Sequence, residues 1–507
     1  MIKIAFCRLP EWNPANVGYL YQTEHQTSAP ASCHQVSENQ LMNLPHHAPW
    51  YRRIGPGLIT ACVVIGPGSI MTSSTVGANH GYSMIWIVIA AVFFQMTFMT
   101  LAGRLGAVGS GSPGDLIRQK SGKPLAIIVG CCVFFISAAF QSGNNVGIAA
   151  VFENFIDPEV FGEDSTLIVA ALIILFNGVA ISFLFAFRNL YQVVERLMMV
   201  FVAIMLLCFA VNLWTLSPDP GEVIAGIVPR PDTLDINVLG LVGTTFVVTA
   251  AFFQTYLVRQ KGWTIEDVRL GAVDARVGSI VMAVITIMLM ATAAAGLHTG
   301  QTVNLANPIA IAKALEPTFG ATGKAIFCLG LFSAAYSSFL VNSMIGGFIL
   351  SDGLGLGSSA SDRWPRILTT LALLSGMLVA LAAMVLKLDP TPTIIAAQAV
   401  TVVGSPLVAG VLLWLSSNRE ILGEHAASKQ IKLFALLGFI LLLAMAARTA
   451  FVTLPKKLND YRNASVIFDE DMKHQQYVLT HENCSMSKAL QPNAKFLGML
   501  AVGRDLV

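Results

Sequence analysis

Long runs of apolar residues, separated by short polar segments, make up most of this chain. A run of about 20 apolar residues is long enough to cross a bilayer as an α-helix. The runs contain no Asp, Glu, Lys or His in their interiors. The pattern predicts an all-α polytopic membrane protein with about 11 transmembrane helices. The expected spans are 55–78, 84–102, 125–152, 167–187, 198–214, 238–258, 279–297, 325–350, 367–386, 393–415 and 433–451.

The first of these runs is interrupted near its start by Gly66, Pro67 and Gly68. Such a break frees backbone groups at membrane depth, which is tolerated only where they line a cavity or bond to neighbours. Discontinuous helices of this kind form the mid-membrane sites of secondary transporters. The alternative is a simple kink, because Gly and Pro are frequent in membrane helices. We expect Pro67 and Gly68 to form an unwound segment at a transport site.

The composition supports a membrane protein. Hydrophobic residues make up 55% of the 507 residues, charged residues make up 12%, and the mean hydropathy is +0.67. These values lie outside the range of soluble domains. We therefore expect one transporter domain at 51–453, between two tails at 1–50 and 454–507. Both tails lack apolar periodicity, which favours disorder or loose packing, and Met42 is an alternative start to Met1.

Charges alternate between successive connecting segments, which predicts the orientation of the chain. The segments before the first span and after even-numbered spans carry cations: Arg52, Arg53, Arg104, Arg118, Lys120, Lys123, Arg188, Arg196, Arg259, Lys261, Arg269, Arg276, Arg363, Arg366, Arg419, Lys429 and Lys432. The segments after the third and fifth spans carry Glu153, Asp157, Glu159, Glu163, Asp164, Asp219 and Glu222. The positive-inside rule then places the N-terminus in the cytoplasm and the C-terminus outside, in the plasma (cell inner) membrane. Glu195 and Asp274 fall outside the expected spans and are assigned to cytoplasmic loops.

The chemistry of an enzyme is not evident in this sequence. No membrane-interior His or carboxylate is available to activate Ser337, Ser338 or Cys62 as a nucleophile. The eight cysteines are scattered without metal-ligand spacing. We expect no catalysis, no cofactor and no nucleic-acid partner, so the expected partners are the bilayer and a transported solute.

Short motifs in a fixed order resemble the Nramp (natural resistance-associated macrophage protein) family of metal-ion transporters. The resemblance covers about residues 50–453 and suggests a divergent member. The motifs that carry it are Gly55-Pro56-Gly57, Ile65-Gly66-Pro67-Gly68-Ser69, Gly81-Tyr82, Ala102-Gly103-Arg104-Leu105-Gly106, Asp115-Leu116, Val194-Glu195-Arg196-Leu197, Pro218-Asp219-Pro220-Gly221-Glu222-Val223, Tyr336-Ser337-Ser338 through Gly346, Gln398, Pro406 and Asn418-Arg419-Glu420.

The resemblance implies a leucine-transporter-type fold, in which a 5+5 inverted repeat is followed by one further helix. It also implies a metal site between broken first and sixth helices. At the positions of the family's Asp-Pro-Gly-Asn this chain has Gly66-Pro67-Gly68-Ser69, so the carboxylate and the amide are absent. The sixth-helix Ala-x-x-Met-Pro-His-Asn corresponds to a segment with Thr244, Val247, Val248, Thr249 and Ala250. Because the proline is lost, we expect a more continuous sixth helix.

The residues expected around the substrate are Gly66, Ser69, Thr244 and Gln398, the last being the one position that keeps a family ligand. Any metal would be held by this same set. Soft sulfur ligands favour transition metals, whereas neutral oxygens suit hard, hydrated cations such as Mg²⁺. For Thr244 and its neighbour Thr245, the alternative is a hydrogen bond back to the preceding turn.

Acidic third-helix positions that the family links to proton movement correspond here to Gln141 and Asn144. Amides do not ionise, so we expect transport without proton coupling. With Gln254 these amides are candidates for a polar path. The alternative is that they join helices to one another, a common role for buried amides in membranes.

The sequence thus predicts a divalent metal cation transporter that works by alternating access, with Mg²⁺ or another hard cation as substrate. The uncharged site better suits a second hypothesis, a secondary transporter of a small neutral or zwitterionic solute. A third hypothesis is a membrane sensor or scaffold that keeps the fold without transporting, because a fold does not determine a function.

Overall fold

The computed structural model describes residues 55–156, 164–187, 189–229, 236–300, 305, 308–386 and 390–453. The expected tails, 1–50 and 454–507, lie outside these residues. So do several expected loop charges: Arg52, Arg53, Asp157, Glu159, Glu163 and Arg188. Everything below concerns the second of two units, Trp50–Val507.

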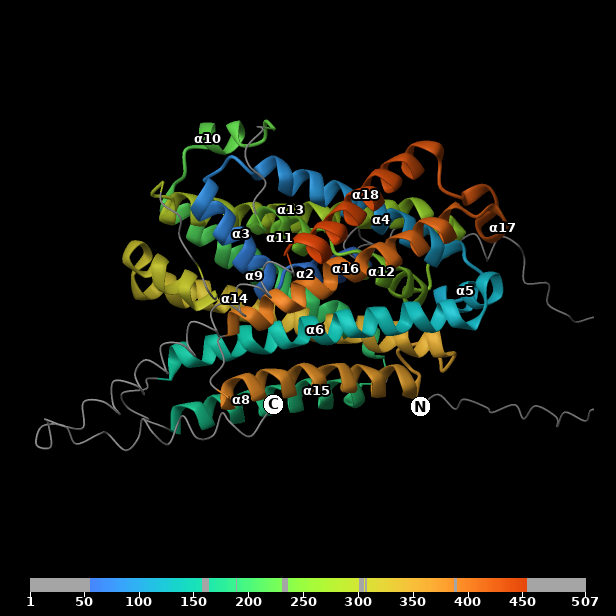
Figure 1. Cartoon of the computed structure of the whole chain (residues 1–507), viewed down its shortest axis with the longest axis horizontal. Helices are drawn as coiled ribbons and strands as arrows, with labels where there is room; N and C mark the ends of the chain where they lie inside the picture. The colour runs from blue at the N-terminus through green and yellow to red at the C-terminus, as the bar shows by residue number, and fades with distance from the viewer. Residues whose placement is uncertain are drawn as a thin grey trace, which may run out of the picture. The chain divides into compact units, whose positions relative to one another are not determined.

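The described residues form helices and their connections (Figure 1). The first five spans are α2 (Pro56–Val64) with α3 (Pro67–His80), α4 (Ile85–Val108), α6 (Lys123–Phe155), α8 (Asp164–Ala186) and α9 (Leu190–Leu216). The next five are α11 (Ile236–Thr245) with α12 (Val248–Lys261), α13 (Val268–Leu297), α14 (Pro308–Leu354), α15 (Arg363–Val385) and α16 (Pro390–Ser417), and the last is α18 (Lys429–Arg448). Short connecting helices are α5 (Pro113–Ser121), α10 (Pro220–Ala225), η2 (Ile265–Asp267), α17 (Arg419–Leu422), η3 (Gly423–His425) and η4 (Thr449–Thr453).

The predicted spans are confirmed. Among the described residues, ten helices are long and apolar enough to cross a membrane, or eleven when α2 and α3 count as one broken span. Several helices are longer than their apolar stretches, so two assignments are wrong. Glu195 lies inside α9 and Asp274 inside α13, not in loops. Both side chains are paired, which allows a charged residue to extend a helix beyond its apolar stretch.

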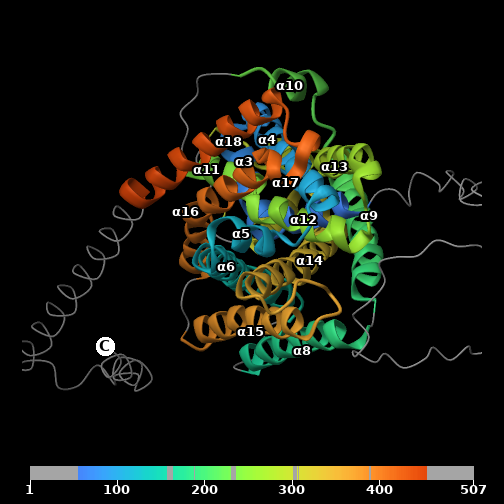
Figure 2. The ribbon, with the colours of Figure 1, turned by 90° about the vertical axis from the view of Figure 1, so that its right-hand side faces the viewer.

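The helices pack so that the broken spans lie among other helices. Helices α6 and α14 run side by side, and α3 packs against α13 (Figures 1 and 2). Helices α8 and α15 lie together on one side of the bundle, and α18 lies against α16 on another. The peripheral helices expose large apolar side chains, as surfaces that face hydrocarbon do: Leu167, Leu175, Leu433 and Leu443 are examples.

The first span breaks where the glycines and the proline predict. Gly66 has an extended conformation (φ −127°, ψ −178°), and Pro67 begins α3 at a position where a missing N–H costs nothing. The two halves are bent by 62°. The break is therefore larger than an ordinary kink.

The sixth span is also interrupted, but less sharply than the first: α11 and α12 together form one candidate span, Asn237–Lys261, and among the described residues only α2 and α3 are bent from one another by more than 40°. That the sixth helix is more continuous than in the rest of the family stays a prediction. Phe246 and Val247 separate α11 from α12, and Val247 is extended (φ −97°, ψ 90°). Phe246 is 1% exposed and its ring lies 5.8 Å from that of Phe94 and 5.4 Å from that of Phe98. Packing against α4 thus accompanies a break at a point where the sequence has no proline.

Candidate substrate site

Hydroxyls from α14 bond to the backbone carbonyls at the break between α2 and α3. Ser338 Oγ donates to the Val63 carbonyl at 3.1 Å, and Ser337 Oγ lies 3.4 Å from the Cys62 carbonyl. Both serines are buried. Carbonyls in a broken membrane helix must find partners within the protein. These two serines therefore hold the broken span against α14.

Gly66 lies where three helices come together. A Cβ at this position would lie 2.7 Å from Ser338 Oγ and 3.5 Å from Asn144 Oδ1. The first of these distances is shorter than real Cβ contacts, so a side chain at Gly66 requires the Ser338 side chain to shift. The glycine is favoured by this close approach and not by its backbone angles, which any residue can adopt.

Ser69 closes the turn that begins α3. The Gly66 N–H donates to Ser69 Oγ at 3.1 Å, and Ser69 Oγ can donate to the Gly66 carbonyl at 3.1 Å. The hydroxyl thus bonds within its own turn, as the third residue of a capping arrangement does. Ser69 is 4% exposed and lies directly beside the break.

Thr244 brings α11 to α3 through a residue that the sequence reasoning missed. Its hydroxyl lies 2.9 Å from the hydroxyl of Thr72. It also lies 3.0 Å from the Gly240 carbonyl, which is the expected alternative of a bond to the preceding turn. Thr72 could have been found from its spacing, because it lies three residues after Ser69 and so on a neighbouring face of the helix. The two broken spans meet at this pair.

Two further hydroxyls flank the break in the sixth span. Thr245 ends α11 and Thr249 lies in the first turn of α12. Both are fully buried, and neither Oγ1 has a hydrogen-bond partner among the described residues. Buried hydroxyls are nearly always bonded. Two unpartnered hydroxyls at a helix break are the kind of group that a bound solute or its water shell would satisfy.

Gln398 belongs to α16, but its side chain lies outside the described part of the structure. The structure therefore neither places it at the break nor removes it from there.

Gln141 and Asn144 connect helices. Gln141 Nε2 donates to the Phe339 carbonyl on α14 at 2.6 Å, and Asn144 Nδ2 donates to Gln141 Oε1 at 2.8 Å. Asn145 in turn accepts a bond from Asn177 on α8 at 2.7 Å. These hydrogen bonds fit the alternative to a polar path, in which buried amides join α6 to α14 and α8.

Gln254 lies in a different network, at the start of α2. It accepts a bond from Thr60 Oγ1 at 2.5 Å and donates to Asp274 Oδ2 at 3.1 Å. Asp274 also accepts from the backbone N–H groups of Gly55 at 2.8 Å and Gly57 at 2.7 Å. A carboxylate at the N-terminus of a helix satisfies unpaired N–H groups and complements the helix dipole. Asp274 thus fastens α2 to α13.

An ion pair lies beside this network. Lys261 Nζ on α12 is 2.5 Å from Glu195 Oε1 on α9. A Cβ on Gly55 would collide with this glutamate, so the start of α2 lies directly against the pair. The N-terminal part of α2 is therefore hydrogen-bonded to α13 and α12 and lies against the ion pair between α12 and α9.

A second buried carboxylate joins α14 to the helix that follows α4. Asp352 accepts bonds from Ser112 Oγ at 2.6 Å, the Gly114 N–H at 2.7 Å and the Tyr256 hydroxyl at 2.7 Å. These partners lie on or next to α5 and on α12. Asp352 therefore fixes α12, the C-terminal half of the sixth span, to α14.

The oxygen atoms at the breaks are neutral. Around them are hydroxyls and backbone carbonyls, and no group of three or more His, Cys, Asp or Glu that could hold a metal occurs among the described residues. Neutral oxygens are hard ligands, which fit hydrated cations better than soft transition metals. These residues supply neutral oxygen atoms and no countercharge.

Comparison with known proteins gives a consistent family. Residues 57–451 match the natural resistance-associated macrophage protein-like family. The divalent metal cation transporter MntH of Chromohalobacter salexigens is 26% identical over 421 residues, which cover 80% of this chain and 92% of the relative. MntH of Deinococcus radiodurans is 24% identical over 409 residues, covering 79% and 88%.

Solved structures show the same fold. A variant of the manganese transporter of Eremococcus coleocola superposes with a TM-score of 0.67 at 16% identity, covering 84% of this chain and 94% of that one. MhsT, solved in complex with L-phenylalanine, superposes with a TM-score of 0.52 at 16% identity, covering 77% and 98%. The leucine-transporter-type arrangement that the sequence predicts is confirmed. The chain therefore belongs to the natural resistance-associated macrophage protein-like family, Nramp.

Proposed function

We propose that the chain is a secondary transporter that carries a divalent metal cation across the plasma membrane by alternating access. Its family and the names of its relatives support cation transport. The observation that carries the proposal is the meeting of the two broken spans at Thr72 and Thr244, whose hydroxyls lie 2.9 Å apart. Paired breaks of this kind are where secondary transporters bind their substrates.

The substrate is a hard cation such as Mg²⁺ that keeps part of its water shell. Mg²⁺ dehydrates reluctantly and is commonly bound through water. The hydroxyls of Ser69, Thr244, Thr245 and Thr249, together with Gln398, offer neutral oxygens to such a shell. The absence of a thioether and of a carboxylate at Gly66 disfavours selection of Mn²⁺ or Fe²⁺.

Transport proceeds without proton coupling. Gln141 and Asn144, at positions where relatives have acids, cannot ionise. Their hydrogen bonds to one another and to α14 support a structural role in its place. The distribution of Arg and Lys supports a cytoplasmic N-terminus and an extracytoplasmic C-terminus.

A small neutral or zwitterionic solute is the second candidate. The unpartnered hydroxyls of Thr245 and Thr249 favour it, because they could bond directly to a polar solute and need no countercharge. A carrier of this kind would move no divalent ion.

The test is ion uptake into proteoliposomes that contain the full chain. Mg²⁺, Mn²⁺ and Ca²⁺ are offered separately, and a reconstituted MntH relative serves as the positive control. We expect Mg²⁺ to enter, and we expect Thr245→Val and Thr249→Val each to slow uptake about fivefold to tenfold, the worth of one hydrogen bond.

Thr370→Val is the matched control, because the Thr370 hydroxyl bonds only to the Arg366 carbonyl on α15. It should transport like the parent chain. If no divalent ion enters while the MntH relative is active, the cation proposal fails and the neutral-solute proposal replaces it.

A further inference from the structure

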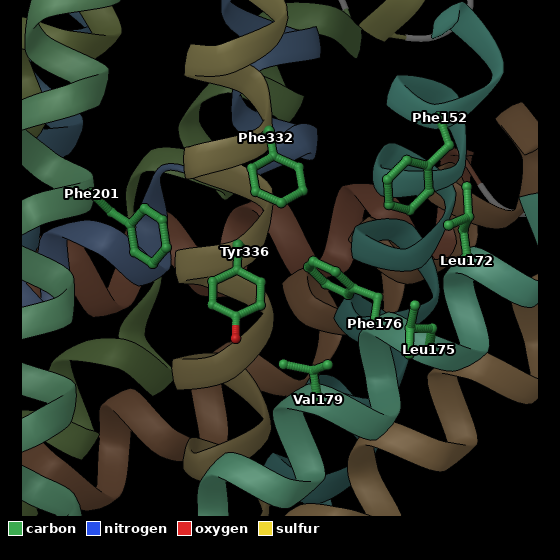
Figure 3. A pocket seen from close by; sticks show the side chains of 8 residues that line it. All are labelled: Phe152, Leu172, Leu175, Phe176, Val179, Phe201, Phe332 and Tyr336. Atoms are coloured by element: carbon green, nitrogen blue, oxygen red, sulfur yellow. The ribbon is translucent and has the colours of Figure 1, made fainter. Parts of the chain in front are cut away.

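A pocket of about 310 Å³ lies between α6, α8, α9 and α14, and its lining residues include none of those that flank the two helix breaks (Figure 3). Helix α8 supplies one wall with Leu172, Leu175 and Val179, and Phe201 of α9 lies opposite. All of its lining side chains are apolar except for the single hydroxyl of Tyr336. The composition of the walls excludes an ion or a charged solute as the occupant.

Aromatic rings build the floor of the pocket. The ring of Phe176 lies 4.8 Å from that of Tyr336, 5.8 Å from that of Phe332 and 6.4 Å from that of Phe152, all in edge-to-face geometry. The ring of Phe201 lies 5.3 Å from that of Tyr336. Rings in such arrangements support one another. The pocket is therefore shaped by contacts among its own walls.

The pocket opens to the surface that faces hydrocarbon. On α8, Leu175 is 63% exposed and Val179 is 52% exposed, and both lie well inside the candidate span Ser165–Ala186. Phe201 and Phe332 likewise lie inside candidate spans. At this depth the surrounding solvent is lipid acyl chain, and water is absent.

The nature of that solvent identifies the occupant. An apolar void without contents forfeits the dispersion contacts of every atom that lines it. Water cannot satisfy its hydrogen bonds among these walls. An acyl chain is apolar, flexible and present at high concentration at the mouth of the pocket. We propose that this pocket binds one acyl chain of a membrane phospholipid.

The acyl-chain pocket is adjacent in sequence to the residues of α14 that contact the first break. Tyr336 directly precedes Ser337 and Ser338, the two residues that contact the carbonyls of the first break. An acyl chain therefore contacts the same turn of α14 that holds α2. Binding of the chain does not depend on the identity of the transported solute.

The experiment is photocrosslinking of the full chain in bilayers. The probe is phosphatidylethanolamine with a diazirine in the middle of one acyl chain, and adducts are located by peptide mass spectrometry. We expect an adduct on the segment of α14 that contains Phe332 and Tyr336. Val179→Trp fills the pocket and should abolish this adduct.

Ile174→Trp is the matched control. Ile174 is on the same helix and is 52% exposed, the same as Val179, but it does not line the pocket. Its adduct on α14 should persist. The proposal is overturned if the α14 adduct is absent from the parent chain, survives in Val179→Trp, or disappears in both variants. Thermal unfolding of both variants, expected near that of the parent chain, shows that loss of the adduct is not loss of the fold.

Discussion

Ser338 Oγ donates a hydrogen bond of 3.1 Å to the Val63 carbonyl, joining α14 to the last turn of α2 across 275 positions of sequence. The same Oγ atom would lie 2.7 Å from a Cβ at Gly66. One residue therefore both satisfies the break in the first span and limits what can be placed there. The break therefore depends on this contact between α2 and α14 as well as on its own glycines and proline.

Removing this hydroxyl should destabilise the protein. Ser338→Ala leaves the buried Val63 carbonyl without its hydrogen-bond donor, at a cost of about 1–3 kcal/mol. The measurement is thermal unfolding in detergent. Ser343→Ala is the control, because Ser343 is equally buried but bonds only to the Leu340 carbonyl of its own helix. Equal melting temperatures for the two variants would contradict the assigned role.

Restoring a side chain at Gly66 should fail unless Ser338 is reduced as well. Gly66→Ala places a Cβ 2.7 Å from Ser338 Oγ, so we expect lost stability, by about 1–3 kcal/mol as in other overpacked sites. Adding Ser338→Gly should recover part of that loss. Gly143→Ala, with open space around its Cβ, is the control. The double-mutant cycle measures the coupling, and additive effects would refute the contact.

The same geometry governs any attempt to restore the family carboxylate. Gly66→Asp alone inserts both a clash and an unpaired charge, so it cannot report on metal preference. Gly66→Asp combined with Ser338→Gly removes the clash. If the chain carries divalent ions, this double variant should move Mn²⁺ faster than Ser338→Gly alone, because a carboxylate supplies the missing countercharge. Unchanged Mn²⁺ uptake would argue against a metal at Gly66.

Weakening the contacts at the N-terminus of α2 should make the buried thiol of Cys62, on the same helix, more accessible. Asp274→Asn keeps one acceptor oxygen and replaces the other with an NH₂ group, so the side chain can no longer accept from the Gly55 and Gly57 N–H groups on separate oxygens. Cys62 on α2 is fully buried. We expect faster maleimide labelling of Cys62, measured by peptide mass spectrometry. Glu424→Gln, at an exposed position, should leave the rate unchanged; equal rates in the two variants would contradict the fastening of α2 by Asp274.

The loop helix α5 should lose stability in acid. Partial burial raises the pKa of Asp115, but hydrogen bonds from Ser112 and Arg118 and the charge of Arg118 outweigh it, so the pKa is lowered overall. A carboxyl whose folded pKa is lowered adds stability that is complete above its unfolded pKa of about 4 and is lost as the pH falls through the folded value. In Asp115→Asn the melting temperature should therefore fall less steeply than in the parent chain as the pH is lowered below about 4. An identical acid dependence would refute this contribution.

The apolar runs predicted every span, because hydropathy and length are local properties of the sequence. Gly66 and Pro67 predicted the first break for the same reason. The second break has no local signal at Val247, and it accompanies the packing of Phe246 on α4. Glu195 and Asp274 were placed in loops because their charges interrupt apolar runs, while the partners that bury them lie far away in sequence.

Site residues were predicted unevenly for a similar reason. Ser69 and Thr244 stand next to the breaks and could be proposed from the family pattern. Thr72 could have been proposed from its spacing after Ser69, whereas the contacts of the α14 serines with the first break are visible only in the tertiary structure. The unpartnered hydroxyls of Thr245 and Thr249 could be recognised only once burial and bonding were known.

Uncoupled Mg²⁺ transport is tested most directly by measuring Mg²⁺ entry and internal pH simultaneously in the same proteoliposomes. Uptake of Mg²⁺ driven by its own gradient, with no acidification of the interior, is the predicted result. Mg²⁺ entry that acidifies the interior would contradict uncoupled transport. It would also show that protons can move although Gln141 and Asn144 do not ionise. Entry of no divalent ion at all, beside an active MntH relative, would contradict the account of the substrate itself.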